Sequence, residues 1–395
     1  MPNLPTPESC TGCSACFSIC PRHAIRMDVD EKGFEVPAVA DTCIECGLCE
    51  KTCPIKAEKP VSLCETQEAY AGISLDEGTW RSSSSGGAFS CLIECYLNTI
   101  PENCPCIVFG AAFESLKVKH IGVGPGGIGP LRKSKYVQSS IGDSFLQTKK
   151  ALDNGIAVIF SGTPCQIAGL RSYLGKDYEL LLCIDFVCHG VGSPKVFEDC
   201  MNEEGRANGK LVTGYSFREK RNRFGNYSRY VSKYTYEDGS ERLVEMDCYN
   251  RLFLSQLCLR DCCGENCAFR NQYRLGDITL ADLNGKNQIF PSLDDPRPYS
   301  SFVVNTKKGR RVCSFLGSRM NLLPMDVEDV KKYNPLFCRT LPENPARKSF
   351  FEEYIMGISV DELADTYAPK HFSVKSWLAA NLPWQLKRLL RRRNG

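Results

Sequence analysis

Two short cysteine runs near the start of the chain hold the residues best suited to chemistry. They read CTGCSACFSICP, beginning at Cys10, and CIECGLCEKTCP, beginning at Cys43, and share the spacing C-x2-C-x2-C-x3-C-P. Three thiolates with two residues between neighbours can bind one face of an iron–sulfur cube. The proline then turns the chain, so that the fourth thiolate reaches a second cube. The spacing predicts two [4Fe–4S] clusters.

This pattern resembles that of bacterial two-cluster ferredoxins, in which the fourth cysteine of each run binds the other cluster. One predicted cluster therefore has the ligands Cys10, Cys13, Cys16 and Cys53, and the other has Cys43, Cys46, Cys49 and Cys20. A pair of zinc sites is the alternative, but zinc sites usually show two separated C-x2-C pairs. The triplets with a trailing Cys-Pro favour a domain that transfers single electrons.

The whole chain has 395 residues and 24 cysteines. Its start, MPNLPTPESC, has neither the basic nor the apolar segment of a signal peptide, so we interpret the thiols as metal ligands, not disulfides. No apolar run approaches the ~18 residues that a membrane span needs. We expect a cytoplasmic protein.

Charge is concentrated at the two ends of the chain. Residues 1–60 have a net charge of −3, from 6 Lys/Arg and 9 Asp/Glu, and residues 370–395 have +7, from 7 Lys/Arg and no acid. Basic residues confined to one short tail argue against a nucleic-acid-binding protein. The tail also carries two tryptophans and several leucines, a composition that suits an anionic membrane surface or an acidic partner. Pro383 interrupts it, which favours a solvated terminal helix.

The remainder of the chain predicts a mixture of helices and strands. A helix is expected over 88–97, buried strands over 106–113, 156–161 and 180–188, a helix over 166–174, a hairpin around Asp238-Gly239, and further strands within 277–285 and 301–306. Strand–helix–strand over 156–188 indicates a parallel unit. The fold class is therefore α+β or α/β: a small ferredoxin-like domain followed by a larger mixed α/β domain.

A serine- and glycine-rich segment precedes the first of these helices. It contains Ser83, Ser84, Ser85, Gly86 and Gly87. Hydroxyls and free N–H groups at a helix N-terminus form a cradle for an anion such as a pyrophosphate, although an ordinary helix cap is the alternative.

A second glycine-rich segment, GVGPGG at 122–127, satisfies G-x-G-x-x-G. Pro125 and Pro130 forbid the helix that a dinucleotide site needs, so we reject that function for this segment.

Cysteines in the larger domain point to a third cluster. Cys165 lies between a predicted strand and helix, and Cys188 ends the next strand, so both thiols should meet at one sheet edge. LRDCCGENCAF adds Cys262, Cys263 and Cys267. Each thiol alone is more typical of a buried core cysteine. A catalytic dyad of Cys188 with its neighbour His189 is disfavoured, since adjacent strand residues face opposite ways.

Five motifs in order carry a resemblance to a known family. SSSGGAF, SKYVQS, FSGTPCQIAGL, VCHGVGSP and LRDCCGENC…DITLADLNG resemble the beta-subunit family of coenzyme F420 hydrogenases and dehydrogenases, which includes 7-hydroxymethyl chlorophyll a reductase. The resemblance covers roughly 65–340. It implies two parts of a beta-subunit-like flavoprotein domain over 65–150 and 151–340. We expect the ferredoxin domain of the cysteine runs over 1–60 before it and a helical tail over 341–395 after it.

The resemblance implies cofactors and residues as well. It implies FAD and a third [4Fe–4S] cluster with ligands Cys165, Cys188, Cys263 and Cys267. The family usually has C-x2-C at the last two, so the choice between Cys262 and Cys263 stays open, and Cys263 is preferred because Cys262 falls where the family commonly has serine. The residues implied for flavin binding are Ser83, Ser84, Ser85, Gly86, Gly87, Lys135, Tyr136, Ser139, Thr163 and Gln166.

These inferences lead to two hypotheses. The first is an iron–sulfur flavoprotein oxidoreductase that passes electrons between a hydride carrier or small substrate, FAD and the clusters, in a direction that the sequence leaves open. Its redox partner would be ferredoxin, reduced deazaflavin or another carrier. The alternative activity within this hypothesis is reduction of a sugar or other metabolite with electrons from ferredoxin. ADLNG stands where the family usually has GDFWG and lacks its aromatic residues, which argues against a deazaflavin as the partner. The second hypothesis is an electron-transfer subunit without its own substrate.

Overall fold

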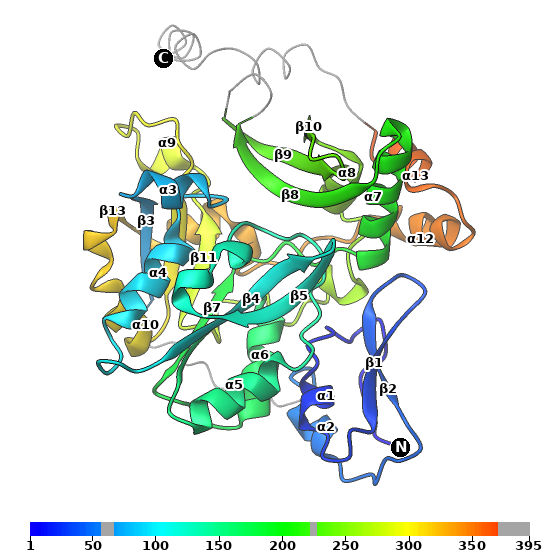
Figure 1. Cartoon of the computed structure of the whole chain (residues 1–395), viewed down its shortest axis with the longest axis horizontal. Coiled ribbons are helices and arrows are strands. Elements are labelled where there is room, and N and C mark those ends of the chain that lie inside the picture. The colour runs from blue at the N-terminus through cyan, green and yellow to red at the C-terminus, as the bar shows by residue number, and fades with distance from the viewer. Residues whose placement is uncertain (57–66, 222–226, 370–395) are drawn as a thin grey trace, which may run out of the picture.

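The N-terminal cysteine runs form a small module beside a larger domain in the computed structural model, which describes residues 1–56, 67–221 and 227–369 (Figure 1). The module contains helices α1 (Ala15–Ile19) and α2 (Leu48–Thr52) and an antiparallel hairpin of β1 (Ile25–Val29) and β2 (Glu35–Val39). Both helices pack against helix α6 (Pro164–Leu174) of the larger domain. Ala15 of α1 belongs to the same apolar core as Phe160 and Ile167. The module is therefore packed onto the larger domain through a shared core.

An eight-stranded mixed sheet forms the centre of the larger domain, in the order β13-β3-β12-β11-β7-β6-β4-β5. The strands are β3 (Glu68–Ser74), β4 (Cys106–Glu114), β5 (Lys117–Val123), β6 (Ala157–Ser161), β7 (Leu181–Phe186), β11 (Ile278–Asp282), β12 (Ser300–Val304) and β13 (Met320–Met325). β4, β6, β7 and β11 run parallel to one another, whereas the outer pairings are antiparallel. The predicted strand–helix–strand unit is confirmed as β6-α6-β7. Residues 65–150 and 151–340 both contribute strands to this one sheet.

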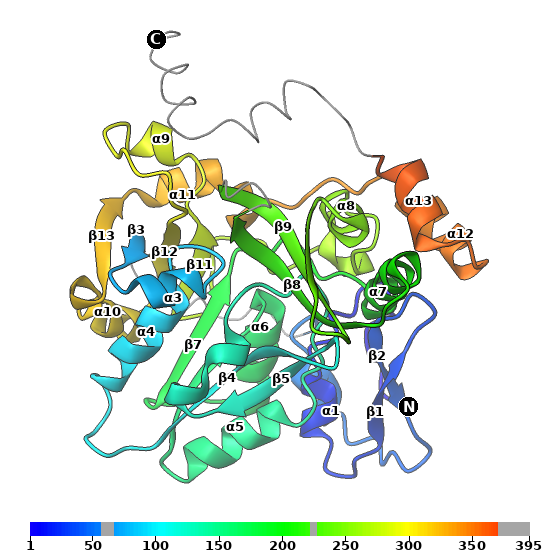
Figure 2. The same ribbon diagram turned by 45° about the horizontal axis from the view of Figure 1, so that its top comes forward.

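Helices cover both faces of the sheet (Figure 2). α4 (Ala88–Leu97) and α10 (Lys307–Cys313) share one apolar core with the sheet, and α5 (Ser144–Asp153) and α6 share another on the opposite face. Burial on both faces explains why the central strands are continuous runs of apolar residues. The shorter helices α3 (Glu77–Arg81), α9 (Lys286–Ile289) and α11 (Val327–Tyr333) lie near the β13-β3 edge.

A second, three-stranded sheet lies beside the first in the order β10-β9-β8. It consists of β8 (Val212–Arg221), β9 (Tyr227–Tyr236) and β10 (Glu241–Glu245), and the β9-β10 turn confirms the hairpin predicted at Asp238-Gly239. Helices α7 (Pro194–Asn208), α8 (Cys248–Leu254), α12 (Arg347–Ile355) and α13 (Val360–Tyr367) share an aromatic-rich core with it. Residues of both sheets line two of the cavities described below.

No helix within the described ranges is long and apolar enough to cross a membrane. The basic, tryptophan-containing part of the tail, residues 370–395, lies outside the described residues, so the predicted contact with a membrane surface or acidic partner stays a prediction.

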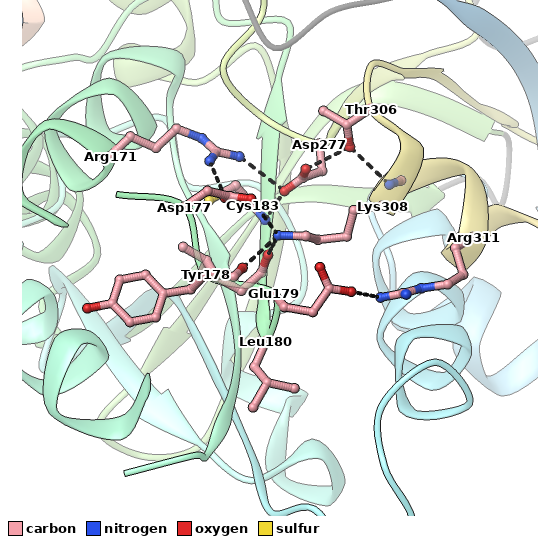
Figure 3. A network of polar contacts seen from close by, with 12 residues as sticks. Arg171, Asp177, Tyr178, Glu179, Leu180, Cys183, Asp277, Thr306, Lys308 and Arg311 are labelled. Carbon is pink, nitrogen blue, oxygen red and sulfur yellow. Dashed lines mark hydrogen bonds and ion pairs between the residues drawn. The ribbon is translucent and has the colours of Figure 1, made fainter. Parts of the chain in front are cut away.

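A buried polar network joins α6, the starts of β7 and β11, and α10 (Figure 3). The Asp277 carboxylate, 2% exposed, accepts hydrogen bonds from the Cys183 backbone N–H at 2.8 Å and from the Thr306 hydroxyl at 2.7 Å. It also lies 3.2 Å from the Arg171 guanidinium of α6. These contacts hold the helix that carries Cys165 at a fixed position on the sheet.

We expect Asp277→Ala to lower the free energy of unfolding by about 3 kcal/mol, because it removes the buried partner of the Arg171 cation and leaves only the exposed Asp177 beside it. Chemical denaturation followed by circular dichroism measures the change. Glu179→Gln is the matched control: Glu179 pairs with Arg311, but its side chain is 70% exposed, so the loss should stay below about 1 kcal/mol. Equal losses in the two variants would contradict this role for Asp277.

Candidate redox centres and their cavities

Both N-terminal cysteine runs adopt the same backbone conformation. Left-handed residues stand at equivalent places, with Gly12 (φ 65°) and Ser14 (φ 61°) in the first run and Glu45 (φ 52°) and Gly47 (φ 71°) in the second. In each run, the backbone N–H two residues after the first cysteine donates to that cysteine's Sγ at 3.4 Å. Such donors stabilise a thiolate. Each loop is thus shaped to present several sulfur atoms to one centre.

The first set of thiols comprises Cys10, Cys13, Cys16 and Cys53. Burial, together with the nearby Cys10 and Cys53 thiols, raises the pKa of Cys13 to about 11. Burial and the other three thiols also raise the pKa of Cys16. The structure therefore brings the fourth cysteine of the second run to the first three of the first run.

The second set comprises Cys20, Cys43, Cys46 and Cys49, which line one small cavity. The Ala24 backbone N–H donates to Cys20 Sγ at 3.3 Å. Cys46 is exposed, whereas Cys49 is buried. The crossed grouping expected from the spacing is present in both sets.

The third set comprises Cys165, Cys188, Cys263 and Cys267, which line one cavity beside α6 together with Cys262. Burial, with the other three thiols nearby, raises the pKa of Cys165 well above its usual value. Thr163 and Gln166 form a capping box that begins α6 next to Cys165. Gly190 (φ 125°) passes the third set closely: a Cβ there would lie 3.1 Å from Cys263 Cβ.

The adjacent cysteines 262 and 263 have different surroundings. Cys262 Sγ lies 3.3 Å from the backbone oxygen of Cys10, in the N-terminal module. A hydrogen bond from the Cys262 thiol to Cys263 lowers the pKa of Cys263 to about 6. Thiolate is the form that binds metal. Both cysteines line the third-set cavity, so the preference for Cys263 as the ligand stays a prediction, and Cys262 has an additional contact with the module.

A cavity of about 480 Å³, here called the main cavity, lies between the two sheets. Nine of the ten residues implied for flavin binding line it: Ser83, Ser84, Ser85, Gly87, Lys135, Tyr136, Ser139, Thr163 and Gln166. Gly86 does not. It packs against the sheet, where a Cβ would come within 2.2 Å of the Gly72 oxygen. The volume is typical of a small-molecule site.

The N-terminus of α4 opens into the main cavity. Its N-cap residue is Gly87 (φ 97°), and no side chain caps the helix. The serine hydroxyls before it have other partners: Ser83 donates to the Thr79 oxygen, and Ser85 to the Tyr299 oxygen. The ordinary helix cap, the alternative for these serines, is therefore not what the structure shows. Arg132 lies beside them and donates to Ser82 and Ser90.

Hydrogen bonds in the wall of the main cavity anchor the first turn of α6, which carries Cys165. Gln166 Nε2 donates to Ser139 Oγ at 3.0 Å, and Ser139 Oγ lies 2.9 Å from His120 Nδ1. Burial lowers the pKa of His120 to about 4, so the ring is neutral at ordinary pH.

The main cavity and the third-set cavity share a wall. The residues that line both are Thr163, Gln166, Cys188, Gly190, Val191 and Leu336.

A second cavity of about 490 Å³, the side cavity, adjoins the main cavity and is rich in cations. Arg218 and Arg229 line both, and Arg218 is buried and pairs with Asp282 at 2.8 Å. Sequence reasoning missed these residues. The one signal was the basic segment SFREKRNRF at 216–224, which alone does not indicate whether its side chains face a cavity or solvent. His189, which the sequence analysis weighed only as a dyad partner of Cys188, lines the main cavity, and its buried Nε2 has no hydrogen-bond partner in the described part of the chain.

Other sequence candidates take no part in these sites. Residues 122–127 end β5 and continue as a short 3-10 turn (Pro125–Gly127), not an α-helix, as the prolines predict. Within the described ranges, no three His, Cys, Asp or Glu side chains lie close enough to share a single metal ion. The chemistry of the two N-terminal thiol sets fits clusters, since each iron of a cube takes one cysteine.

Two family models match parts of the chain. Residues 156–322 match the family of the carboxy-terminal region of the coenzyme F420 hydrogenase/dehydrogenase beta subunit, and residues 9–57 match the "4Fe-4S dicluster domain". The resemblance inferred from the motifs is confirmed. The chain is an iron–sulfur electron-transfer oxidoreductase related to the F420 hydrogenase beta subunits.

Among solved structures, the xenon-derivatised F420-reducing [NiFe] hydrogenase complex from Methanosarcina barkeri is similar. The match covers 76% of this chain and 96% of that chain, with 15% sequence identity and a TM-score of 0.45. No curated protein matches the chain.

Proposed function

We propose that this chain is a flavin-dependent iron–sulfur oxidoreductase that transfers electrons between a hydride carrier or small substrate and its clusters. The observation that carries the proposal is the wall shared by the main cavity and the third-set cavity, which includes Cys188. A group bound in the main cavity would lie next to a cluster ligand. Bound FAD would supply the exchange between electron pairs and single electrons.

The residues of the main cavity fit FAD. The uncapped N-terminus of α4, which has ten residues, and Arg132 form a cradle for a pyrophosphate. Lys135 adds a cation whose Nζ donates to the Pro130 and Arg132 backbone oxygens. Burial lowers the pKa of Lys135 to about 7, and an anion beside it would favour the charged form.

The third set fits a [4Fe–4S] cluster. Its four thiols line one cavity together with Cys262, and the Gly190 backbone N–H donates to Cys188 Sγ at 3.4 Å. Arg270 also lines this cavity, and its positive charge offsets part of the charge of four thiolates. Cys165, Cys188, Cys263 and Cys267 would be the ligands, as Cys10 to Cys53 would be for the other two clusters.

The charge of the side cavity favours an anionic hydride carrier or substrate. Five cations line it, Arg218, Lys220, Arg229, Lys286 and Arg297, against the two carboxylates of Glu219 and Asp282. A hydride carrier or metabolite with phosphate or carboxylate groups suits this charge. A reduced deazaflavin, another anionic carrier, or a phosphorylated sugar reduced with electrons from ferredoxin all belong to this class. The reducing compartment that many free thiols need is the cytoplasm.

Anaerobic purification tests the cofactor content. Quantitation should give about twelve irons, an equal amount of sulfide and one flavin per chain. A result of about eight irons and no flavin per chain would mean that only the N-terminal module holds cofactors, and it would refute the proposal. Turnover of the isolated chain with a hydride carrier, followed as flavin bleaching, then separates an enzyme from an electron-transfer subunit, which would bind the cofactors but oxidise no carrier.

A further inference from the structure

Helix α6 contacts both the third set and the first set of thiols. Cys165 lies in its first turn, and Gly169 follows four residues later on the same face. A Cβ at Gly169 would lie 3.0 Å from both Cβ and Sγ of Cys13. Glycine therefore allows a first-set sulfur to rest on the helix about one turn from a third-set sulfur.

A second contact joins the same two sets. Cys262, next to Cys263, has its Sγ 3.3 Å from the Cys10 backbone oxygen. The Arg260 guanidinium, 2% exposed, donates to that oxygen at 2.6 Å. Thr11 and Ile55, which neighbour first-set cysteines, line the third-set cavity. Two separate segments of the larger domain thus meet the loop that carries Cys10 and Cys13.

The second set has a different environment. Every residue that lines its cavity belongs to the module, from Pro2 to Cys49. Cys46 is exposed, and its neighbours Ile44 and Leu48 are 59% and 39% exposed. The second set therefore faces away from the larger domain.

We propose that the three thiol sets are arranged in a row, with the first set between the third and the second. An external one-electron carrier then exchanges electrons with the chain at the second set. The proposal rests on the proposed function, because it needs the third cluster. Oxidation of one hydride supplies two electrons and releases one proton. Two molecules of the external carrier are therefore each reduced by one electron at the second set, the exposed end of the row.

The order can be tested by electron paramagnetic resonance on dithionite-reduced protein. Neighbouring reduced clusters broaden each other's signals. Cys46→Ser should remove about four irons and leave a coupled pair, since the first and third sets remain. Cys13→Ser should also remove about four irons but leave two uncoupled signals.

A coupled pair in Cys13→Ser, or uncoupled signals in Cys46→Ser, would overturn the order. Iron content near eight in the unaltered protein would instead refute the third cluster itself, and the relay with it. If either variant does not fold, the cytochrome c experiment below still tests the other half of the proposal, the point of exchange, because its variants keep every ligand.

The exposed end is tested with cytochrome c, a cationic haem protein that takes one electron. Ile44→Lys puts a like charge beside Cys46 and should slow cytochrome c reduction by pre-reduced protein at least about threefold. Val29→Lys is the matched control, since Val29 is 67% exposed in β1 of the same module and the net charge changes equally. Equal rates in the two variants, with iron content intact, would overturn the second set as the point of exchange.

Discussion

Cys165→Ser should remove about four of about twelve irons and leave the flavin bound. Cys165 begins α6 and lies among the other third-set thiols, so its loss leaves the cube with three ligands. The residues that surround the main cavity should stay in place, because the Gln166 side chain bonds to the Thr163 backbone N–H and to Ser139 and does not use the Cys165 thiol. Electrons from reduced flavin should then no longer reach the N-terminal clusters. Iron and sulfide analysis measures the first effect, and stopped-flow absorbance measures the second.

The control for this variant is Cys104→Ser. The Cys104 thiol lies 3.5 Å from the Gly155 backbone oxygen, and Cys104 lines neither the second-set cavity nor the third-set cavity. Its iron content should equal that of the unaltered protein. If Cys165→Ser kept the full iron content, Cys165 would be an ordinary buried cysteine and the third cluster would lose its support.

Arg132→Gln should weaken FAD binding between roughly tenfold and a hundredfold while iron content stays unchanged. The guanidinium lies at the N-terminus of α4, where it donates to Ser82 and Ser90 and lines the main cavity. A charged hydrogen bond is worth about 1.5–3 kcal/mol, which sets the size of the loss. Titration of flavin-depleted protein with FAD, followed by fluorescence, gives the dissociation constant.

Two comparisons make this result specific to the pyrophosphate. Riboflavin has no phosphate, so its affinity should change little in Arg132→Gln. Arg206→Gln removes a cation from α7 whose side chain is 70% exposed, and it should leave FAD binding unaltered. An equal loss of riboflavin affinity would mean that Arg132 supports the shape of the cavity and does not bind a phosphate.

Local spacing was enough to predict the features that a few neighbouring residues define. The left-handed residues and the N–H···S bonds of the two cysteine runs lie within each run, so the C-x2-C-x2-C spacing alone indicates cluster loops. The helix predicted at 88–97 and the β6-α6-β7 unit are also local. The two prolines near residues 122–127 excluded a dinucleotide-binding helix for the same reason.

Contacts between distant segments could not be predicted this way. The place of β3, between β12 and β13, depends on pairing across more than two hundred residues. The main cavity receives Arg218 from β8 and Asp282 from β11, and a basic strand does not show which way its side chains face.

What the sequence by itself determined is therefore the kind of chemistry: thiol sets with cluster spacing and the motifs of a redox domain. Only the tertiary structure decided how these parts are connected. It shows that Cys262 and Cys263 both line the third-set cavity and that the Cys262 thiol also approaches the Cys10 backbone. It also shows that Gly169 admits Cys13 to the face of α6. Ligand spacing is fixed by the covalent chain within a turn, whereas the approach of one redox centre to another depends on packing between elements far apart in the sequence.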